Sequence, residues 1–193
     1  MPVPSLDLPL GTRMPWFRVT DLDGRVWTTA DADGKPESVI VFLSQHSPYV
    51  KHIEKHLGAA CARLLDKGVM VLGISPNDVS AYPSDSPEML LGQAARAGFS
   101  FPYAVDPSQR AAKAFRATCT PEFFLYDHEL RLVYHGQYDA SRPDNDFEPT
   151  GGDVLQAVRA TGNREVVSGV QPKSLGCSIK WRAGNEPGYL LAA

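Results

Sequence analysis

Residues 39–51 read VIVFLSQHSPYVK and join the two clearest elements of the chain. Residues 39–43 are continuously apolar, which predicts a strand buried on both faces. From residue 50 onward, apolar side chains recur at steps of three and four residues, which predicts an amphipathic helix over 48–65 that ends near Gly68. The polar residues 44–48, SQHSP, therefore lie at a turn from a buried strand into a helix.

The same pattern continues on both sides of this turn. A second continuous apolar run covers 69–74, and strands buried on both faces require helices on both sides of their sheet. The further elements that we expect are a hairpin over 16–28, a helix over 87–97, a short strand near 103–105, a helix near 107–116, a hairpin of 123–126 with 132–134, and a helix over 152–161. The chain is thus predicted to be α/β, with a central mixed β-sheet flanked by helices. We expect a single domain over 1–193, made of an arm (1–12), a core (13–163) and an irregular tail (164–193).

Composition narrows the class of protein. The chain has 193 residues, 43% apolar and 21% charged, as expected for a globular domain that buries a core without crosslinks. A net charge of −3 gives no reason to expect nucleic-acid binding. Three widely spaced cysteines do not form a secreted disulfide scaffold. Because residues 1–9 lack a basic and apolar leader pattern and no apolar run reaches the roughly 20 residues of a membrane span, we expect a cytoplasmic protein that does not enter membranes.

The motifs occur in the order of a known family. The stretch Ser44-Gln45-His46-Ser47-Pro48-Tyr49-Val50-Lys51 resembles Cys-Asn-His-Cys-Pro-Tyr-Val-Lys of thioredoxin-like proteins in the alkyl hydroperoxide reductase/thiol-specific antioxidant class. Further matches within residues 14–187 are Asn77-Asp78, Tyr82-Pro83-x-Asp85-Ser86-Pro87-Glu88, Phe101-Pro102-Tyr103, Thr120-Pro121-x-Phe123-Phe124-Leu125, Tyr134-x-Gly136-Gln137, Ser141-Arg142-Pro143 and Gly176-Cys177-Ser178-Ile179-Lys180-Trp181. The resemblance implies a thioredoxin-like fold and a thiol-dependent redox function. Because Gln45 also differs from the family's Asn, natural divergence is favoured over engineered replacement of the two cysteines.

Ser44 and Ser47 stand where the family carries its catalytic cysteine pair. A thiol at a helix start ionises readily, with a pKa between roughly 3.5 and 7.5, whereas a serine hydroxyl stays protonated and forms no disulfide. Ser47 before Pro48 also has the pattern of a helix cap, worth about 1 kcal/mol relative to Ala. His46 is the nearby base that a nucleophilic serine would need, but no acidic residue beside it is evident to orient its ring, so a hydrolase is not favoured.

Cys119 is the remaining sulfur of interest. By resemblance, Thr120-Pro121 contains a cis bond that packs against the helix start, which would bring Cys119 near Ser44 and Ser47. Cys119 is then either a relocated redox thiol, perhaps paired with Cys177, or an inert buried residue, and we favour the second. Cys61 lies on the apolar face of its helix and is expected in the core.

Other polar residues give weaker signals. His52 and His56 lie four residues apart on the predicted helix, but no third ligand is evident, so we expect a solvated face and no metal site. Arg142 is expected either to line the edge of the site or to form a structural salt bridge. The residues that we expect to form a binding surface are Gln45, His46, Pro48, Thr120, Pro121 and Arg142.

Two hypotheses of function remain at this point. The first is residual thiol chemistry through Cys119, in a protein otherwise related to oxidoreductases and antioxidant peroxidases. The second is a non-catalytic module that binds a protein or peptide in the groove beside Pro121. Neither requires a cofactor.

Overall fold

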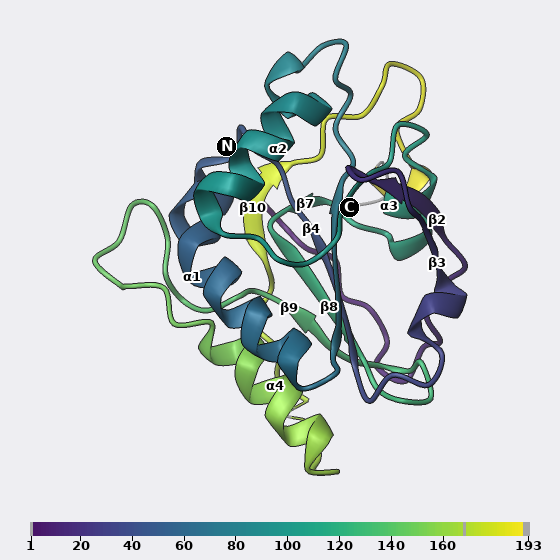
Figure 1. The fold of residues 1–193 in the computed structure, drawn as a ribbon, viewed down its shortest axis with the longest axis vertical. Helices are drawn as coiled ribbons and strands as arrows, with labels where there is room; N and C mark the ends of the chain where they lie inside the picture. The colour runs from purple at the N-terminus through teal and green to yellow at the C-terminus, as the bar shows by residue number, and fades with distance from the viewer. Residues whose placement is uncertain (1, 168, 191–193) are drawn as a thin grey trace.

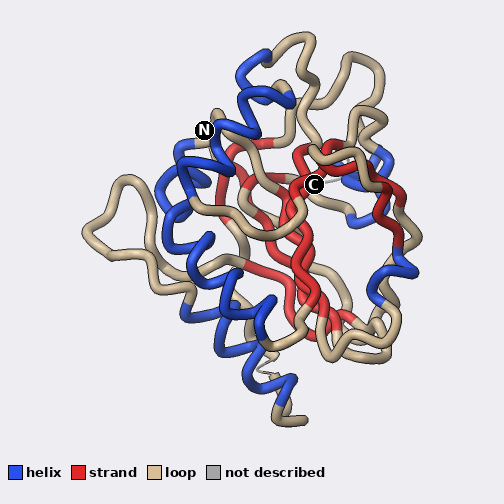
Figure 2. The backbone as a smooth tube through the Cα atoms, viewed as in Figure 1, coloured by secondary structure: helices blue, strands red, loops and turns tan. Residues whose placement is uncertain are grey.

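The structure is a computed structural model that describes residues 2–167 and 169–190. Figure 1 shows a central twisted sheet with helices on both sides, and Figure 2 separates the strands from the helices that cover them. The helices are α1 (Pro48–Asp66), α2 (Pro87–Ala97), α3 (Arg110–Phe115) and α4 (Gly152–Gly162), with short 3-10 turns at Thr29–Ala32, Pro83–Asp85 and Gly188–Leu190. The strands are β1 (Val3–Pro4), β2 (Arg18–Asp21), β3 (Val26–Thr28), β4 (Ser38–Phe42), β5 (Met70–Ser75), β6 (Tyr103–Val105), β7 (Cys119–Thr120), β8 (Glu122–Tyr126), β9 (Leu132–Gly136) and β10 (Leu175–Ser178).

The main sheet is mixed, as expected. Its strand order is β3-β2-β6-β5-β4-β8-β9. Strands β4, β5 and β6 are parallel to one another, and β8 is antiparallel to β4. Parallel strands need helical crossovers, and α1 and α2 supply them. The predicted strands and helices are therefore confirmed, with boundaries that differ by a few residues.

Alternate residues of β4 separate the core into two layers. Val39 and Val41 face α1 and α4, whereas Ile40 and Phe42 face α3 and the N-terminal segment. All four side chains are at most 2% exposed. The continuous apolar run in the sequence thus reflects burial on both faces of the strand.

The arm and the tail are more ordered than expected. The predicted irregular tail contains β10, which pairs antiparallel with β1 on one side and with β7 on the other, so the arm is also tied to the molecule. The register places Cys177 opposite Thr120 and Gly176 opposite Val3. Residues 1, 168 and 191–193 of the arm and tail lie outside the described residues. Among the described helices, none combines the length and apolar character that crossing a membrane requires.

Candidate functional site

The segment 44–47 is held at the carboxyl end of β4 by a buried carboxylate. Asp85 is 0% exposed and lies in the 3-10 turn that precedes α2. Its Oδ1 accepts hydrogen bonds from the backbone N–H groups of Gln45 (2.7 Å) and His46 (3.2 Å). Its Oδ2 accepts from Nδ2 of Asn77 (2.7 Å) and lies 2.6 Å from Nδ1 of His46. Two segments that follow parallel strands are thereby fixed to each other.

These contacts determine the charge of the carboxylate. Burial by itself would raise the pKa of Asp85, but hydrogen bonds from His46 and Asn77 outweigh it and hold the pKa below its ordinary value. Asp85 is therefore ionised at neutral pH and acts only as an acceptor. The expectation that no acidic residue orients His46 was wrong, because the orienting group comes from a position 39 residues further along the chain.

Ser44 is part of the same cluster. Its Oγ donates to Asp85 at 3.1–3.2 Å and lies 3.0 Å from Nδ1 of His46. In a serine–histidine–carboxylate relay, the nucleophile and the carboxylate contact different ring nitrogens. Here both contact Nδ1, and Ser44 is 0% exposed. These contacts anchor the turn. Because Asp85 already occupies Nδ1 of His46, the ring does not act as a base toward the Ser44 hydroxyl.

Ser47 occupies the helix-cap position of α1, but its hydroxyl does not cap the helix. Pro48 is at the first helical position, and Ser47 forms no side-chain capping hydrogen bond. Its Oγ instead donates to the carbonyl oxygen of Thr120 at 3.1 Å. The Thr120–Pro121 bond is cis, as predicted. Ser47 thus joins the helix start directly to the cis-proline loop, and the predicted packing of the Thr120–Pro121 loop against the helix start is confirmed.

Cys119 lies on the same loop but is sealed from solvent. It is 0% exposed, and burial together with the Glu122 carboxylate raises the pKa of its thiol well above the ordinary value. Glu122 accepts hydrogen bonds from the backbone N–H groups of Thr118 (2.8 Å) and Cys119 (3.1 Å), and it lies 2.7 Å from Nε2 of His135. This environment opposes ionisation of the Cys119 thiol.

The other two sulfurs are also free thiols. Cys61 is in the core, as expected, and burial raises the pKa of its thiol to about 12. Cys177 is partly exposed and lies on β10, next to the strand that carries Cys119.

The edge of β7 beside Pro121 is covered by the protein's own tail. β10 pairs with β7, and Ile179 adds a backbone hydrogen bond to Thr118 (2.9 Å). Gly176 approaches so closely that a Cβ there would lie 2.2 Å from the carbonyl oxygen of Thr120. The cavity beside Pro121 is only about 20 Å³, which is enough for about one water molecule. The groove expected there is therefore filled.

Arg142 lines that small cavity, as one of the two expectations had it. Its guanidinium donates to the backbone carbonyls of Asp139 and Ser141 (2.7 Å each) and to the side chain of Gln137. No salt bridge of Arg142 appears within the described part of the chain. Arg142 therefore braces the loop that follows β9.

The outer rim of the site is aromatic and accessible. The ring of His46 stacks on Tyr82 at a centroid distance of 5.5 Å, and Nζ of Lys180 lies 5.6 Å from the Tyr82 ring. The side chain of His46 is 22% exposed and Tyr82 is 38% exposed. Pro48 is exposed beside them. Of the residues expected to form a binding surface, His46 and Pro48 face solvent, whereas Gln45, Thr120 and Pro121 are buried.

The predicted solvated histidine face is only partly correct. His52 and His56 are both half-buried, and Nδ1 of His56 lies 2.8 Å from the hydroxyl of Tyr138. In the part of the chain that the structure describes, no three His, Cys, Asp or Glu side chains are grouped to hold a metal ion.

Comparisons with known proteins agree with this architecture. Residues 10–135 match the model of the AhpC/TSA family. A hypothetical protein from Sinorhizobium meliloti, SMc02350, is 40% identical, with a TM-score of 0.91 over 94% of this chain and 99% of that one. An uncharacterised conserved protein from Geobacillus kaustophilus is 39% identical, with a TM-score of 0.91 over 94% and 97% of the two chains.

A more distant similarity identifies the fold alone. The thioredoxin domain of a thiol-disulfide oxidoreductase from Bacteroides vulgatus is 15% identical, with a TM-score of 0.60 over 79% of this chain and 99% of that one. The predicted thioredoxin-like fold is confirmed by this match together with the mixed sheet. A search of curated proteins found no match.

Proposed function

The chain belongs to the AhpC/TSA family, and we propose that it is a member without thiol–disulfide exchange activity that binds a protein or peptide partner. One observation carries the proposal: the two side chains at the strand-to-helix turn are hydroxyls, and both are buried and hydrogen-bonded within the protein. Ser44 donates to Asp85 and Ser47 donates to Thr120. A buried hydroxyl with a fixed acceptor neither ionises at neutral pH nor exchanges with a disulfide.

The environments of the three thiols favour this proposal over a relocated active site. Cys61 and Cys119 are buried, with thiol pKa values raised above the ordinary value. Attack on a disulfide or peroxide requires an accessible thiolate. Cys177 is partly exposed, but the described residues offer no second accessible thiol to resolve a mixed disulfide formed there.

The rim around the helix start is the surface that we propose for the partner. The strand edge beside Pro121 is already paired with β10, so an extended peptide would have to displace the tail in order to add there. His46, Tyr82 and Pro48 remain exposed on the outside of the same turn. Aromatic side chains are favoured at the centres of protein interfaces because they bury large areas at low entropic cost.

The loss of redox activity is tested by restoring the cysteines. The unmodified protein should not accelerate reduction of insulin by dithiothreitol above the buffer rate. The double variant S44C/S47C should form a reducible disulfide and gain turnover, because the strand–turn–helix frame is present. The single variant S47C, which lacks a partner thiol, is the matched control. Turnover by the unmodified protein that disappears in C119A would contradict the proposal.

Partner binding at the rim is tested separately with a displayed library of random peptides. Peptides selected on the unmodified protein should lose binding to the variants His46→Ala and Tyr82→Ala, by about tenfold or more if the two rings lie at the centre of the interface. Trp16→Ala removes another exposed aromatic residue, 70% exposed, on the N-terminal segment, and serves as the control. Selected peptides that bind both rim variants unchanged would argue against this surface.

A further inference from the structure

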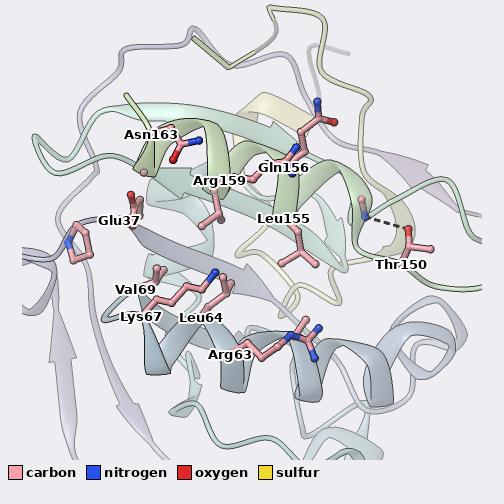
Figure 3. A pocket seen from close by; sticks show the side chains of 15 residues that line it. Glu37, Arg63, Leu64, Lys67, Val69, Thr150, Leu155, Gln156, Arg159 and Asn163 are labelled. Carbon is pink, nitrogen blue, oxygen red and sulfur yellow. Dashed lines mark hydrogen bonds between the residues drawn. The ribbon is translucent and has the colours of Figure 1, made fainter. Parts of the chain in front are cut away.

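A second feature lies at the other end of α1 from Ser47. A cavity of about 850 Å³ opens between the C-terminal half of α1 and the length of α4 (Figure 3). Its volume is within the range of about 300–1,000 Å³ that is typical of small-molecule sites. The proposed partner surface around His46 does not contribute to its lining.

Three cationic side chains line this cavity from two helices. Arg63 comes from α1, Lys67 directly follows the end of α1, and Arg159 comes from α4 on the facing wall (Figure 3). Among residues 2–167 and 169–190, none of the three takes part in an ion pair. The three side chains are solvent-exposed, and cations without acidic partners around one cavity create a positive potential that favours an anionic group.

The cavity also contains a buried carboxyl group. Glu37 is 6% exposed and lines the end formed by Lys67, Gly162 and Asn163. Its carboxyl takes part in no ion pair among the described residues, and burial raises the pKa of this carboxyl. A partly buried carboxyl without an ion pair is available to a ligand that supplies an N–H donor or a cation.

The space between these charges is apolar. Leu64 and Val158 are each 7% exposed, and Leu155 points into the gap from α4 in Figure 3. Figure 3 places Glu37 and Arg63 toward opposite ends of the cavity. Lining residues of α4 run from Gly152 to Gly162, a rise of roughly 15 Å at 1.5 Å per residue. An extended peptide of about three to four residues, with its terminal groups, has a comparable length.

We propose that this cavity binds a short acidic peptide with a free N-terminus, whose ammonium group pairs with Glu37 and whose carboxylates pair with Arg63, Lys67 and Arg159. The apolar side chain of such a peptide packs on Leu64 and Leu155. The charges of the peptide are opposite in sign to those of the cavity, because its ammonium group meets one carboxyl group and its carboxylates meet three cations. A simple anion would leave Glu37 without a partner, and a simple amine would leave the three cations without one.

The test uses the tripeptide Ala-Leu-Glu and three matched derivatives, titrated into the full protein by calorimetry. Acetylation removes the ammonium group, C-terminal amidation removes one carboxylate, and Ala-Leu-Gln removes the acidic side chain. The parent peptide should bind in a saturable, one-to-one manner. The acetylated peptide should bind about tenfold more weakly, and the two derivatives that lose a carboxylate, whose partners are exposed cations, about two- to fivefold more weakly.

Variants of the protein locate the contacts. Glu37→Gln should weaken the parent peptide about tenfold but leave the affinity for the acetylated peptide unchanged, because the two changes remove the same pair. Arg159→Gln should weaken all four peptides, and Arg18→Gln, an exposed cation on β2, should weaken none. The ligand series keeps the test valid even if a variant folds poorly. Equal affinity for the acetylated and free peptides, or no saturable heat up to about 10 mM, would overturn the proposal.

Discussion

Asp85 and His46 lie 2.6 Å apart, from Oδ2 to Nδ1, although 39 residues separate them in sequence. The carboxylate that fixes the imidazole also accepts two backbone N–H groups of the same turn. One side chain thus fixes both the backbone and the exposed ring of the strand-to-helix turn. The exposed face of His46 can contact a partner without reorganising, since its ring is already held from behind.

The first prediction concerns the stability that Asp85 supplies. Asp85→Asn keeps one acceptor oxygen but turns an N–H₂ group toward donors such as Asn77. We expect the free energy of unfolding at pH 7 to fall by about 2–4 kcal/mol, because a buried hydrogen-bond network loses an acceptor and an ion. Urea denaturation measures it. Asp146→Asn, an exposed carboxylate, is the control and should change the value by less than about 0.5 kcal/mol.

The second prediction is the pH dependence of that effect. The pKa of Asp85 is lower in the folded than in the unfolded chain, so the folded state gains stability above the unfolded pKa, near 3.9, and loses it as the pH falls through the folded value. The difference in unfolding free energy between the unmodified protein and Asp85→Asn should therefore shrink as the pH falls below about 4.

Other carboxyl groups also change the absolute pH profile of stability. Burial raises the pKa of Asp106, and hydrogen bonds lower that of Asp139, so the absolute profile mixes opposite signs. These contributions cancel between the two proteins. A difference that grows as the pH falls below about 4 would contradict the assignment of Asp85 as the ionised group.

The sequence predicts the strands and helices of this fold better than the tertiary contacts that hold them together. Continuous apolar runs and helical periodicity identify β4, β5 and α1, because burial on both faces leaves a local pattern. The contact between Asp85 and His46 is tertiary and leaves no local pattern. Its only sequence signal is the match at Tyr82-Pro83-x-Asp85, which identifies a family position without its partner. β10 escaped prediction for a related reason: Leu-Gly-Cys-Ser has little strand propensity, and the close approach of two backbones is what requires Gly176.

The third prediction concerns the order of thiol labelling. Cys177 is partly exposed, whereas Cys61 and Cys119 are buried with raised thiol pKa values. Iodoacetamide at pH 7 should therefore modify Cys177 first, and the other two only on unfolding. Cys119→Ala should cost about 1 kcal/mol, since it removes a small buried side chain. Mass-spectrometric mapping across pH 5–9 gives the labelling midpoints. A midpoint for Cys119 below about 7.5 would instead identify it as an activated thiol.

The last prediction concerns the strand that covers the cis-proline loop. A Cβ at Gly176 would lie 2.2 Å from the carbonyl oxygen of Thr120, and the atoms that it meets belong to the backbone, which cannot move aside cheaply. Gly176→Ala should therefore push β10 away from β7 and lower the free energy of unfolding by about 1–3 kcal/mol. Because β10 covers the strand that carries Cys119, the same variant should make this thiol accessible to labelling in the folded protein. Gly188→Ala is the control, since a Cβ there meets no atom within 4 Å. If Gly176→Ala left Cys119 as protected as before, β10 would not be the element that seals this loop.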